Sequence, residues 1–382
     1  MMVTTIHENW NVWPDRGFLL SPDPLTAPAD APGMDAQRRA LETITALVDQ
    51  LPVLVQNPAV LAERCAALPP LDVTNAHTWD GRVCERIVQQ LAFLASACVY
   101  ADFECRRQTI PAALAVPFAA LSALVERPPM FSYTSLVLAN WRRIDPAGGI
   151  EIDNLTALNT FTGRADEIWF ALIHVDIEAR AAEALRGAVS AITAIRSHDD
   201  QAMLASLTAI ENGLRAMMKS FRRMRSGCDP DVYYHQIRPF NFGFINVTFE
   251  GVFGNAPQNF RGGSGAQSSV IPALIAALGI AHEATDLMVH LNAMRAYMPR
   301  AHRAFIDQMR TIGIREYVAA AKNPRLTDAY NACLRAVTLF RQLHMNYAKL
   351  YVFERGGPIG TGGTPFMDWL DKLIAETEAH YL

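Results

Sequence analysis

Apolar residues recur at steps of three and four along most of the chain, the spacing of one face of an α-helix. This period is clear over 41–55 and 87–98, and Ala-rich segments with the same period cover 168–196, 202–225 and 270–297. One segment alternates instead: Ile245, Val247 and Phe249 are apolar and the residues between them are polar, which predicts a short strand. We therefore expect an all-α protein with minimal β structure.

Pro- and Gly-rich segments interrupt the helical pattern at Pro128-Pro129, 145–149 and 355–364. Segment 1–30 is rich in Pro, Asp and Ala, and we expect a tail that becomes ordered on contact with the rest of the chain. No repeat of 20–50 residues is visible. These breaks predict a smaller N-terminal domain at 1–125 and a larger helical domain at 126–382.

Composition excludes two broad classes of protein. Of the 382 residues, 51% are hydrophobic and 19% are charged, and the mean hydropathy is +0.08. An intrinsically disordered chain has low hydrophobicity and high charge, so that class is excluded. The net charge of −4 gives no electrostatic reason to expect nucleic acid as a partner. The chain has the composition of a globular protein with a large apolar interior.

The six cysteines include no C-x-x-C pair, so we expect no zinc site, only thiols of a reducing compartment. The group His282-Glu283…Asp286…His290 lacks the H-E-x-x-H spacing of a metalloprotease, and we expect it to cap or line a helix. Segments 112–125 and 270–281 are too short to span a membrane, and 1–17 lacks the apolar core of a signal peptide. A cytoplasmic protein without membrane association is the expectation.

Two histidines fall on apolar helical stripes. Within 334–352, His344 shares a stripe with Val337 and Phe340, and within 168–182, His174 shares a face with Phe170. A histidine so placed is either a core residue with its hydrogen bonds satisfied or an axial ligand of heme, which requires an imidazole inside apolar walls. The pattern alone leaves both interpretations open.

Two glycine-rich segments and one arginine are further candidates for ligand binding. Segment 262–269 leads into an apolar helix, with Ser268 or Ser269 as a natural N-cap, and 357–364 lies between two helices. Neither has the Lys of a P-loop. A loop or helix cap is therefore the favoured interpretation of each segment, and ligand binding is the second. Arg238 lies among aromatic residues, where a guanidinium needs a partner: a substrate carboxylate or one of the chain's own carboxylates.

Taken together, these segments resemble the indoleamine 2,3-dioxygenase family of heme enzymes, which open the indole ring of tryptophan. The resemblance rests on a series of segments in order and covers nearly the whole chain, most weakly at the N-terminus. The segments are YTSLVLANW at 133–141, GGSGAQSS at 262–269, MPRAHRAF at 298–305, RQLH at 341–344 and GTGGT at 360–364.

The resemblance implies a role for each matching position. It implies that His344 is the proximal ligand of the iron of heme b, and that Ser264 and Gly265 lie in a loop over the heme near the substrate. It implies that the N-terminal domain covers the distal side. Roles in substrate binding are implied for Tyr133 and Phe170 in the pocket wall, Arg238 at the carboxylate and Thr361 in a closing loop. His302 matches a family histidine that is not the iron ligand, so a structural role is expected for it.

Two positions depart from the mammalian pattern. His174 stands where those enzymes have serine, and Tyr233 stands where they have phenylalanine. A histidine at that place is similar to the distal histidine of tryptophan 2,3-dioxygenases, and an imidazole can accept a hydrogen bond from the indole N–H. We therefore expect His174 to act beside Arg238 in catalysis by positioning the substrate, and Tyr233 to contact it.

The expected reaction is cleavage of the indole C2–C3 bond of L-tryptophan by O₂ to give N-formylkynurenine, with an electron donor keeping the iron ferrous. Three alternatives stay open. One is a heme oxygenase of the same fold acting on another indole or a substituted tryptophan in secondary metabolism. The second is a heme protein that binds O₂ without turnover, and the third is a helical interaction protein without heme.

Overall fold

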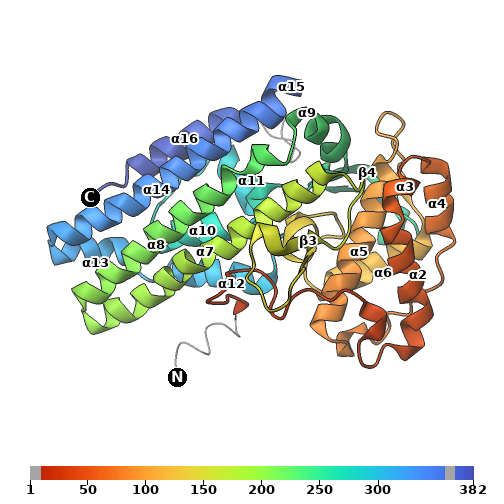
Figure 1. Cartoon of the computed structure of the whole chain (residues 1–382), viewed down its shortest axis with the longest axis horizontal. Helices are drawn as coiled ribbons and strands as arrows, with labels where there is room; N and C mark the ends of the chain where they lie inside the picture. The colour runs from red at the N-terminus through yellow and green to blue at the C-terminus, as the bar shows by residue number, and fades with distance from the viewer. Residues whose placement is uncertain (1–9, 358–365) are drawn as a thin grey trace.

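The computed structural model describes residues 10–357 and 366–382. Helices account for most of the described residues and the strands are few and short, which confirms the predicted all-α class. Figure 1 shows a compact group of N-terminal helices at one end and long helices extending away from it. Among the described residues, no helix is both long enough and apolar enough to cross a membrane.

The N-terminal helices pack around α5 (Gly81–Tyr100), which is buried on nearly every side. A helix that is apolar all round has to be enclosed by neighbours, and α5 is packed against by α2, α4 and α6. The predicted helical segment 41–55 is divided between α2 and α3. The bounds of these helices are α2 Arg38–Asp49, α3 Leu51–Leu54, α4 Pro58–Ala66 and α6 Ala112–Leu124.

The long helices α7 (Ala165–Ser197) and α8 (Asp200–Phe221) form the centre of the C-terminal part, as the sequence predicts. Their backbones approach closely because Gly213 has no side chain: a Cβ there would lie 2.5 Å from the backbone nitrogen of Ala184. Helix α14 packs on α8, and α16 packs on α14. The remaining helices are α9 Pro230–Val232, α10 Val270–Ala277, α11 Asp286–Arg295, α12 Arg300–Met309, α13 Ile314–Ala321, α14 Pro324–Ala348, α15 Glu354–Gly356 and α16 Phe366–Glu378.

The predicted continuous helix over 270–297 is wrong. It is two helices, α10 and α11, separated by a loop that begins after Leu278. Gly279 adopts φ +68°, the left-handed conformation with which helices commonly end. The loop then turns to contact α16, where His282 Nδ1 lies 2.5 Å from Glu376 Oε2 and Lys372 Nζ lies 2.7 Å from Glu283 Oε2.

The predicted strand is present as β4 (Phe244–Phe249), but one side chain faces the other way. Val247 and Phe249 are buried, whereas Ile245 is 61% exposed. A register shift between Phe244 and Val247 in the pairing with β5 causes this, because the extra residue of a bulge reverses the alternation. β4 lies between β1 (Thr109–Ile110, parallel) and β5 (Pro257–Phe260, antiparallel), and β2 (Trp141–Arg143) pairs with β3 (Leu155–Ala157).

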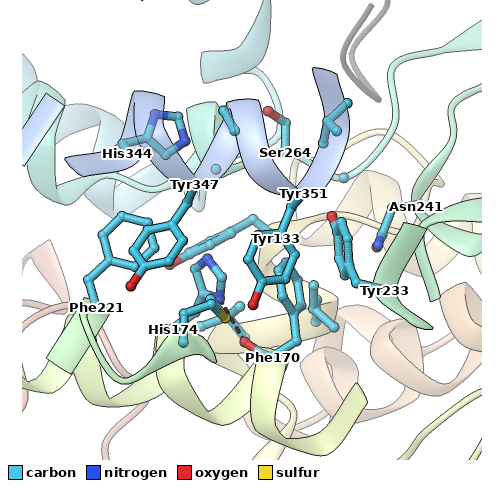
Figure 2. A pocket seen from close by; sticks show the side chains of 17 residues that line it. Tyr133, Phe170, His174, Phe221, Tyr233, Asn241, Ser264, His344, Tyr347 and Tyr351 are labelled. Carbon is cyan, nitrogen blue, oxygen red and sulfur yellow. Dashed lines mark hydrogen bonds between the residues drawn. The ribbon is translucent and has the colours of Figure 1, made fainter. Parts of the chain in front are cut away.

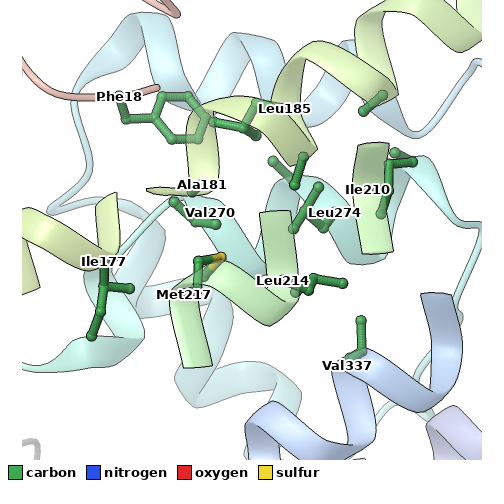
Figure 3. Packing of buried hydrophobic residues seen from close by; sticks show 14 of the residues in the cluster. Phe18, Ile177, Ala181, Leu185, Ile210, Leu214, Met217, Val270, Leu274 and Val337 are labelled. Atoms are coloured by element: carbon green, nitrogen blue, oxygen red, sulfur yellow. The ribbon is translucent and has the colours of Figure 1, made fainter. Parts of the chain in front are cut away.

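Two hydrophobic cores meet at the middle of the molecule. The smaller core is built mainly from α2 to α6, but it also takes in Phe240, Phe244 and Phe249 from far along the chain. The larger core surrounds α7 and α8, and Phe18 of the N-terminal segment packs into it beside Leu185 (Figure 3). The described part of the predicted tail is therefore shared: Val12, Phe18 and Leu19 belong to the larger core, and Ala29 belongs to the smaller one. The boundary between 125 and 126 stays a prediction.

Candidate active site

A cavity lies between α7 on one side and the C-terminal part of α14 on the other. Its other walls come from η4 (Thr134–Leu138) with Tyr133, the end of α8, η7 (Tyr233–Ile237), η8 (Arg238–Asn241) and the segment 263–265. Six of the sequence-predicted site residues line it together with His344 (Figure 2): Tyr133, Phe170, His174, Tyr233, Ser264 and Gly265. The structure thus brings together residues separated by more than two hundred positions in the sequence.

His344 lies on α14 and its side chain is exposed to the cavity. Desolvation by the protein around the ring, together with nearby His174, lowers the pKa of His344 to about 4. The imidazole is therefore neutral at physiological pH, the form that ligates a metal. No hydrogen bond to the described residues occupies its ring nitrogens. The interpretation of His344 as a core histidine with satisfied hydrogen bonds is not supported.

His174 lies on α7, on the opposite side of the cavity (Figure 2). Its Nδ1 lies 2.7 Å from the backbone oxygen of Phe170. Because a carbonyl oxygen can only accept, Nδ1 carries the proton of this bond. Burial lowers the pKa of His174, so the ring is neutral and its Nε2 keeps a free lone pair. His174 therefore offers a hydrogen-bond acceptor.

Aromatic rings form most of the cavity wall. The rings of Phe170 and Tyr233 have centroids 4.4 Å apart, and the ring of Tyr133 meets that of His174 edge to face at 6.2 Å. Tyr351 is fixed by a hydrogen bond from its hydroxyl to the backbone oxygen of Cys228 at 2.6 Å. Flat apolar walls of this kind suit a planar aromatic ligand.

All three π-helical turns in the described part of the chain border the cavity. They are η4, η7 and η11 (Lys349–Phe353), which contribute Val137, Tyr233 and Tyr351 respectively. A π turn inserts an extra residue into a helix and rotates the side chains that follow, and such turns are frequent at functional sites. The periodicity of apolar residues does not predict them.

The glycine-rich segment borders the cavity through Gly263, Ser264 and Gly265. Ser264 Oγ accepts a hydrogen bond from Ala266 N at 3.2 Å and so caps the short turn η10 (Gly265–Gln267). Gly262 serves the fold: a Cβ there would lie 2.2 Å from the backbone oxygen of Asn241. The segment is therefore both a loop required by the fold and a wall of the cavity.

Arg238 does not line the cavity itself. Its guanidinium lies between two rings, 4.9 Å from the centroid of Tyr234 and 4.6 Å from that of Phe242, and only 5% of the residue is exposed. Asn241, three residues along the same short helix, does line the cavity. The predicted role of Thr361 concerns a residue outside the described part of the chain.

Asn241 is the polar residue of the cavity that sequence reasoning missed. It is 4% exposed and adds an amide to a wall that already contains the hydroxyl of Tyr233. Its signal in the sequence is weak, since an Asn after Pro239-Phe240 is typical of any turn. Only the folded position of η8 distinguishes it.

The other histidine candidates lie away from the cavity. His302 is buried against Phe18, with ring centroids 4.4 Å apart, and burial lowers its pKa to about 3. His290 Nδ1 lies 3.0 Å from Arg261 Nη1.

Among the described residues, no group of three or more His, Cys, Asp or Glu is arranged to hold a metal ion. Five of the six cysteines are buried and Cys105 is exposed.

The residues present fit a heme. The cavity is lined by aromatic and aliphatic side chains, and a neutral imidazole without a protein partner projects into it from α14. An apolar cavity with a neutral histidine whose ring nitrogens have no protein partner suits an iron porphyrin, for which histidine is a common axial ligand. His344 would hold the iron, and Tyr347 and Tyr351 of the same helical stretch would contact the ring.

Comparison with known proteins decides the family. A sequence model described as indoleamine 2,3-dioxygenase matches residues 6–357. The chain belongs to the indoleamine 2,3-dioxygenase family. It is therefore a heme-dependent dioxygenase that acts on indoles, an oxidoreductase.

Two relatives cover almost the whole chain and a third covers most of it. Indoleamine 2,3-dioxygenase of Saccharomyces cerevisiae is 31% identical over 97% of this chain and 93% of the relative. Indoleamine 2,3-dioxygenase 1 of Mus musculus is 31% identical over 98% and 95%. A 6-hydroxytryptophan 2,3-dioxygenase of Fusarium equiseti is 27% identical over 90% and 84%. One relative is thus named for a substituted tryptophan.

Proposed function

We propose that the protein cleaves the indole C2–C3 bond of L-tryptophan with O₂ and gives N-formylkynurenine. One observation carries this proposal: His344 and His174 lie on opposite sides of a single aromatic cavity. The reaction is balanced without another substrate, since one O₂ is added to one tryptophan and both oxygen atoms stay in the product. Bound heme supplies the iron at which O₂ is activated.

The cofactor in this proposal is heme b. The sequence contains no C-x-x-C-H segment, the motif that attaches heme covalently through thioether bonds. The described cavity offers His344 as the axial ligand and aromatic contacts for the ring. An external electron donor keeps the iron ferrous.

The residues opposite His344 orient the substrate. His174 Nε2 accepts a hydrogen bond from the indole N–H, because its Nδ1 proton is already donated to Phe170 O. Tyr133 and Phe170 pack on the indole ring and exclude water. Arg238, on the same short helix as the cavity residue Asn241, pairs with the substrate carboxylate.

A second candidate substrate is a hydroxylated tryptophan. The observation in its favour is polarity: Tyr233 and Asn241 add a hydroxyl and an amide to the cavity wall. A relative is named as a 6-hydroxytryptophan 2,3-dioxygenase. These two groups can form hydrogen bonds with the additional hydroxyl of the substrate, which an apolar wall cannot.

The test compares kcat/KM for L-tryptophan, 6-hydroxytryptophan and 5-hydroxytryptophan with the reduced, heme-loaded protein. The proposal expects N-formylkynurenine from L-tryptophan and the highest kcat/KM for it. A kcat/KM for a hydroxytryptophan at least tenfold higher assigns the second candidate. Stable O₂ binding without any product would favour the alternative of a heme protein that binds O₂ without turnover. A purified protein that takes up no heme would favour the alternative of a helical interaction protein.

A further inference from the structure

Glu178 is a buried carboxyl group that the proposed reaction does not use. It lies on α7, one helical turn beyond His174, and is 1% exposed. Its Oε1 accepts two hydrogen bonds, from the hydroxyl of Tyr133 at 2.9 Å and from the hydroxyl of Ser268 at 2.7 Å. Its Oε2 is buried and has no hydrogen-bond partner among the described residues.

The two donors come from two different walls of the site. The ring of Tyr133 lines the cavity, and Ser268 follows the segment 263–265, which also lines it. A second contact joins the same two walls, because Tyr133 N donates to Gln267 Oε1 at 2.9 Å. Gln267 Nε2 in turn donates to the backbone oxygen of Gly262 at 2.9 Å. Tyr133 is therefore held at its backbone and at its hydroxyl.

A carboxyl group at this position is costly for the fold. Burial disfavours its charged form and raises its pKa to about 7, and the two hydroxyl donors only partly offset this. An apolar side chain of similar size would pack here without that cost. Such a side chain would not accept the hydrogen bonds that the Tyr133 and Ser268 hydroxyls donate to Glu178.

We propose that Glu178 is a positioning residue that joins Tyr133 to the segment 262–269, and so fixes the two walls of the cavity relative to each other. The proposal rests on the proposed function in one respect: the walls formed by Tyr133 and the segment 262–269 are those that bind the indole. Without this acceptor, the Tyr133 hydroxyl and the Ser268 hydroxyl lose their common partner. The tyrosine ring then rotates and the segment loosens, without loss of His344.

The test uses two variants that differ in the acceptor. Glu178→Gln keeps an oxygen that accepts both hydrogen bonds, whereas Glu178→Leu fills the space and accepts none. The first readout is hydrogen–deuterium exchange of the backbone amides in 262–269, measured before and after heme is added. The second is the KM and kcat for L-tryptophan together with the absorption spectrum of the bound heme.

For Glu178→Leu, we expect at least tenfold faster exchange in 262–269, at least fivefold higher KM and an unchanged Soret maximum in the substrate-free protein. For Glu178→Gln, we expect exchange and KM within twofold of the unchanged protein. Asp176→Asn is the matched control. Asp176 is also buried on α7 and accepts a hydrogen bond from Ser220 of α8, so loss of its charge tests the general effect of a buried acid.

Equal exchange in Glu178→Leu and the unchanged protein would overturn the proposal, as would a Glu178→Gln variant as impaired as Glu178→Leu. If Glu178→Leu does not fold, Ser268→Ala removes one of the two donors, and unchanged exchange in that variant would contradict the proposal. The exchange readout separates this proposal from the proposed function. A protein that is inactive toward every indole can still show tenfold faster exchange in Glu178→Leu. An active protein can lack that difference in exchange.

Discussion

Two histidines on opposite walls of one cavity differ in how their ring nitrogens are engaged. His174 donates its Nδ1 proton to the backbone of its own helix, which leaves Nε2 as an acceptor. His344 has no such partner among the described residues and faces the cavity with a neutral ring. The helical backbone thus gives the first histidine a fixed tautomer and leaves the second available to a metal.

Loss of the His344 imidazole is expected to abolish heme binding. The variant His344→Ala, reconstituted with heme, should show no Soret band, because α14 then offers no imidazole to the iron. His174→Ala is the matched control, since it removes the histidine on the opposite wall, and it should keep the band. An absorption spectrum checks both. A normal Soret band in His344→Ala would assign the ligand elsewhere.

Loss of the Arg238 guanidinium is expected to weaken tryptophan binding. A charge-assisted hydrogen bond contributes about 1.5–3 kcal/mol, so Arg238→Ala should raise the KM for L-tryptophan by about ten- to a hundredfold. The Soret band should stay, because Arg238 does not line the cavity.

Steady-state kinetics with tryptamine provide the control for Arg238→Ala. Tryptamine lacks the carboxylate, so its kinetics should be the same in the variant as in the unchanged protein. Tryptophan kinetics unaffected by the substitution would remove the carboxylate role from Arg238. An equal loss with both substrates would show that its packing between Tyr234 and Phe242 matters instead.

The residues of the site were predictable to different degrees. His174 and His344 are visible in the sequence because each interrupts a regular apolar stripe. Their convergence on one cavity is a property of the packing of α7, α8 and α14, which no local pattern specifies. Asn241 was not predictable, since one amide in a turn is common and only the position of η8 brings it to the cavity.

At the scale of elements, the long helices were predicted well and the breaks between them were not. The pattern over 168–196 and 202–225 is regular because one face of each helix is buried along its whole length. The break after α10 begins at Gly279, whose φ is positive, and apolar residues on both sides of the break keep the helical spacing. The π turns leave no periodic trace, because each adds only one residue to a helix.

The backbone at Gly262 crosses the backbone at 241–243 in close contact, and this contact gives a prediction about stability. Gly262→Ala should lower the free energy of unfolding by about 3 kcal/mol, the upper end of overpacking costs, since its Cβ would overlap the backbone of Asn241 and Gly243. Gly265→Ala is the control from the same segment. A Cβ there has no heavy atom within 4 Å, so its stability should change by less than about 0.5 kcal/mol. Denaturant unfolding measures both, and equal stability of the two variants would contradict the packing described.

At the scale of the whole molecule, buried ionisable groups link stability to pH with opposite signs. Burial lowers the pKa of His302 to about 3, against 6.5 in the unfolded chain. Between these values the unfolded chain binds the extra proton, so His302 makes stability rise with pH. Burial raises the pKa of Glu178 to about 7, against 4.5. In that range the folded protein binds the extra proton, so Glu178 makes stability fall as pH rises.

Two variants separate these contributions. Between pH 4.5 and 6, His302→Gln should lower the slope of the unfolding free energy against pH, and Glu178→Gln should raise it. Each change is at most about 1.4 kcal/mol per pH unit, the value for one proton. Denaturant unfolding at several pH values measures the slopes. Parallel curves for the three proteins would show that neither group is buried in the form described.

The central claim is that the cavity between α7 and α14 supports cleavage of L-tryptophan by O₂ in which both oxygen atoms reach the product. The most direct measurement is the mass of the product formed from L-tryptophan under ¹⁸O₂ by the reduced, heme-loaded protein. We predict N-formylkynurenine that contains two ¹⁸O atoms. A product with one ¹⁸O atom, or recovery of unchanged tryptophan, would contradict the claim.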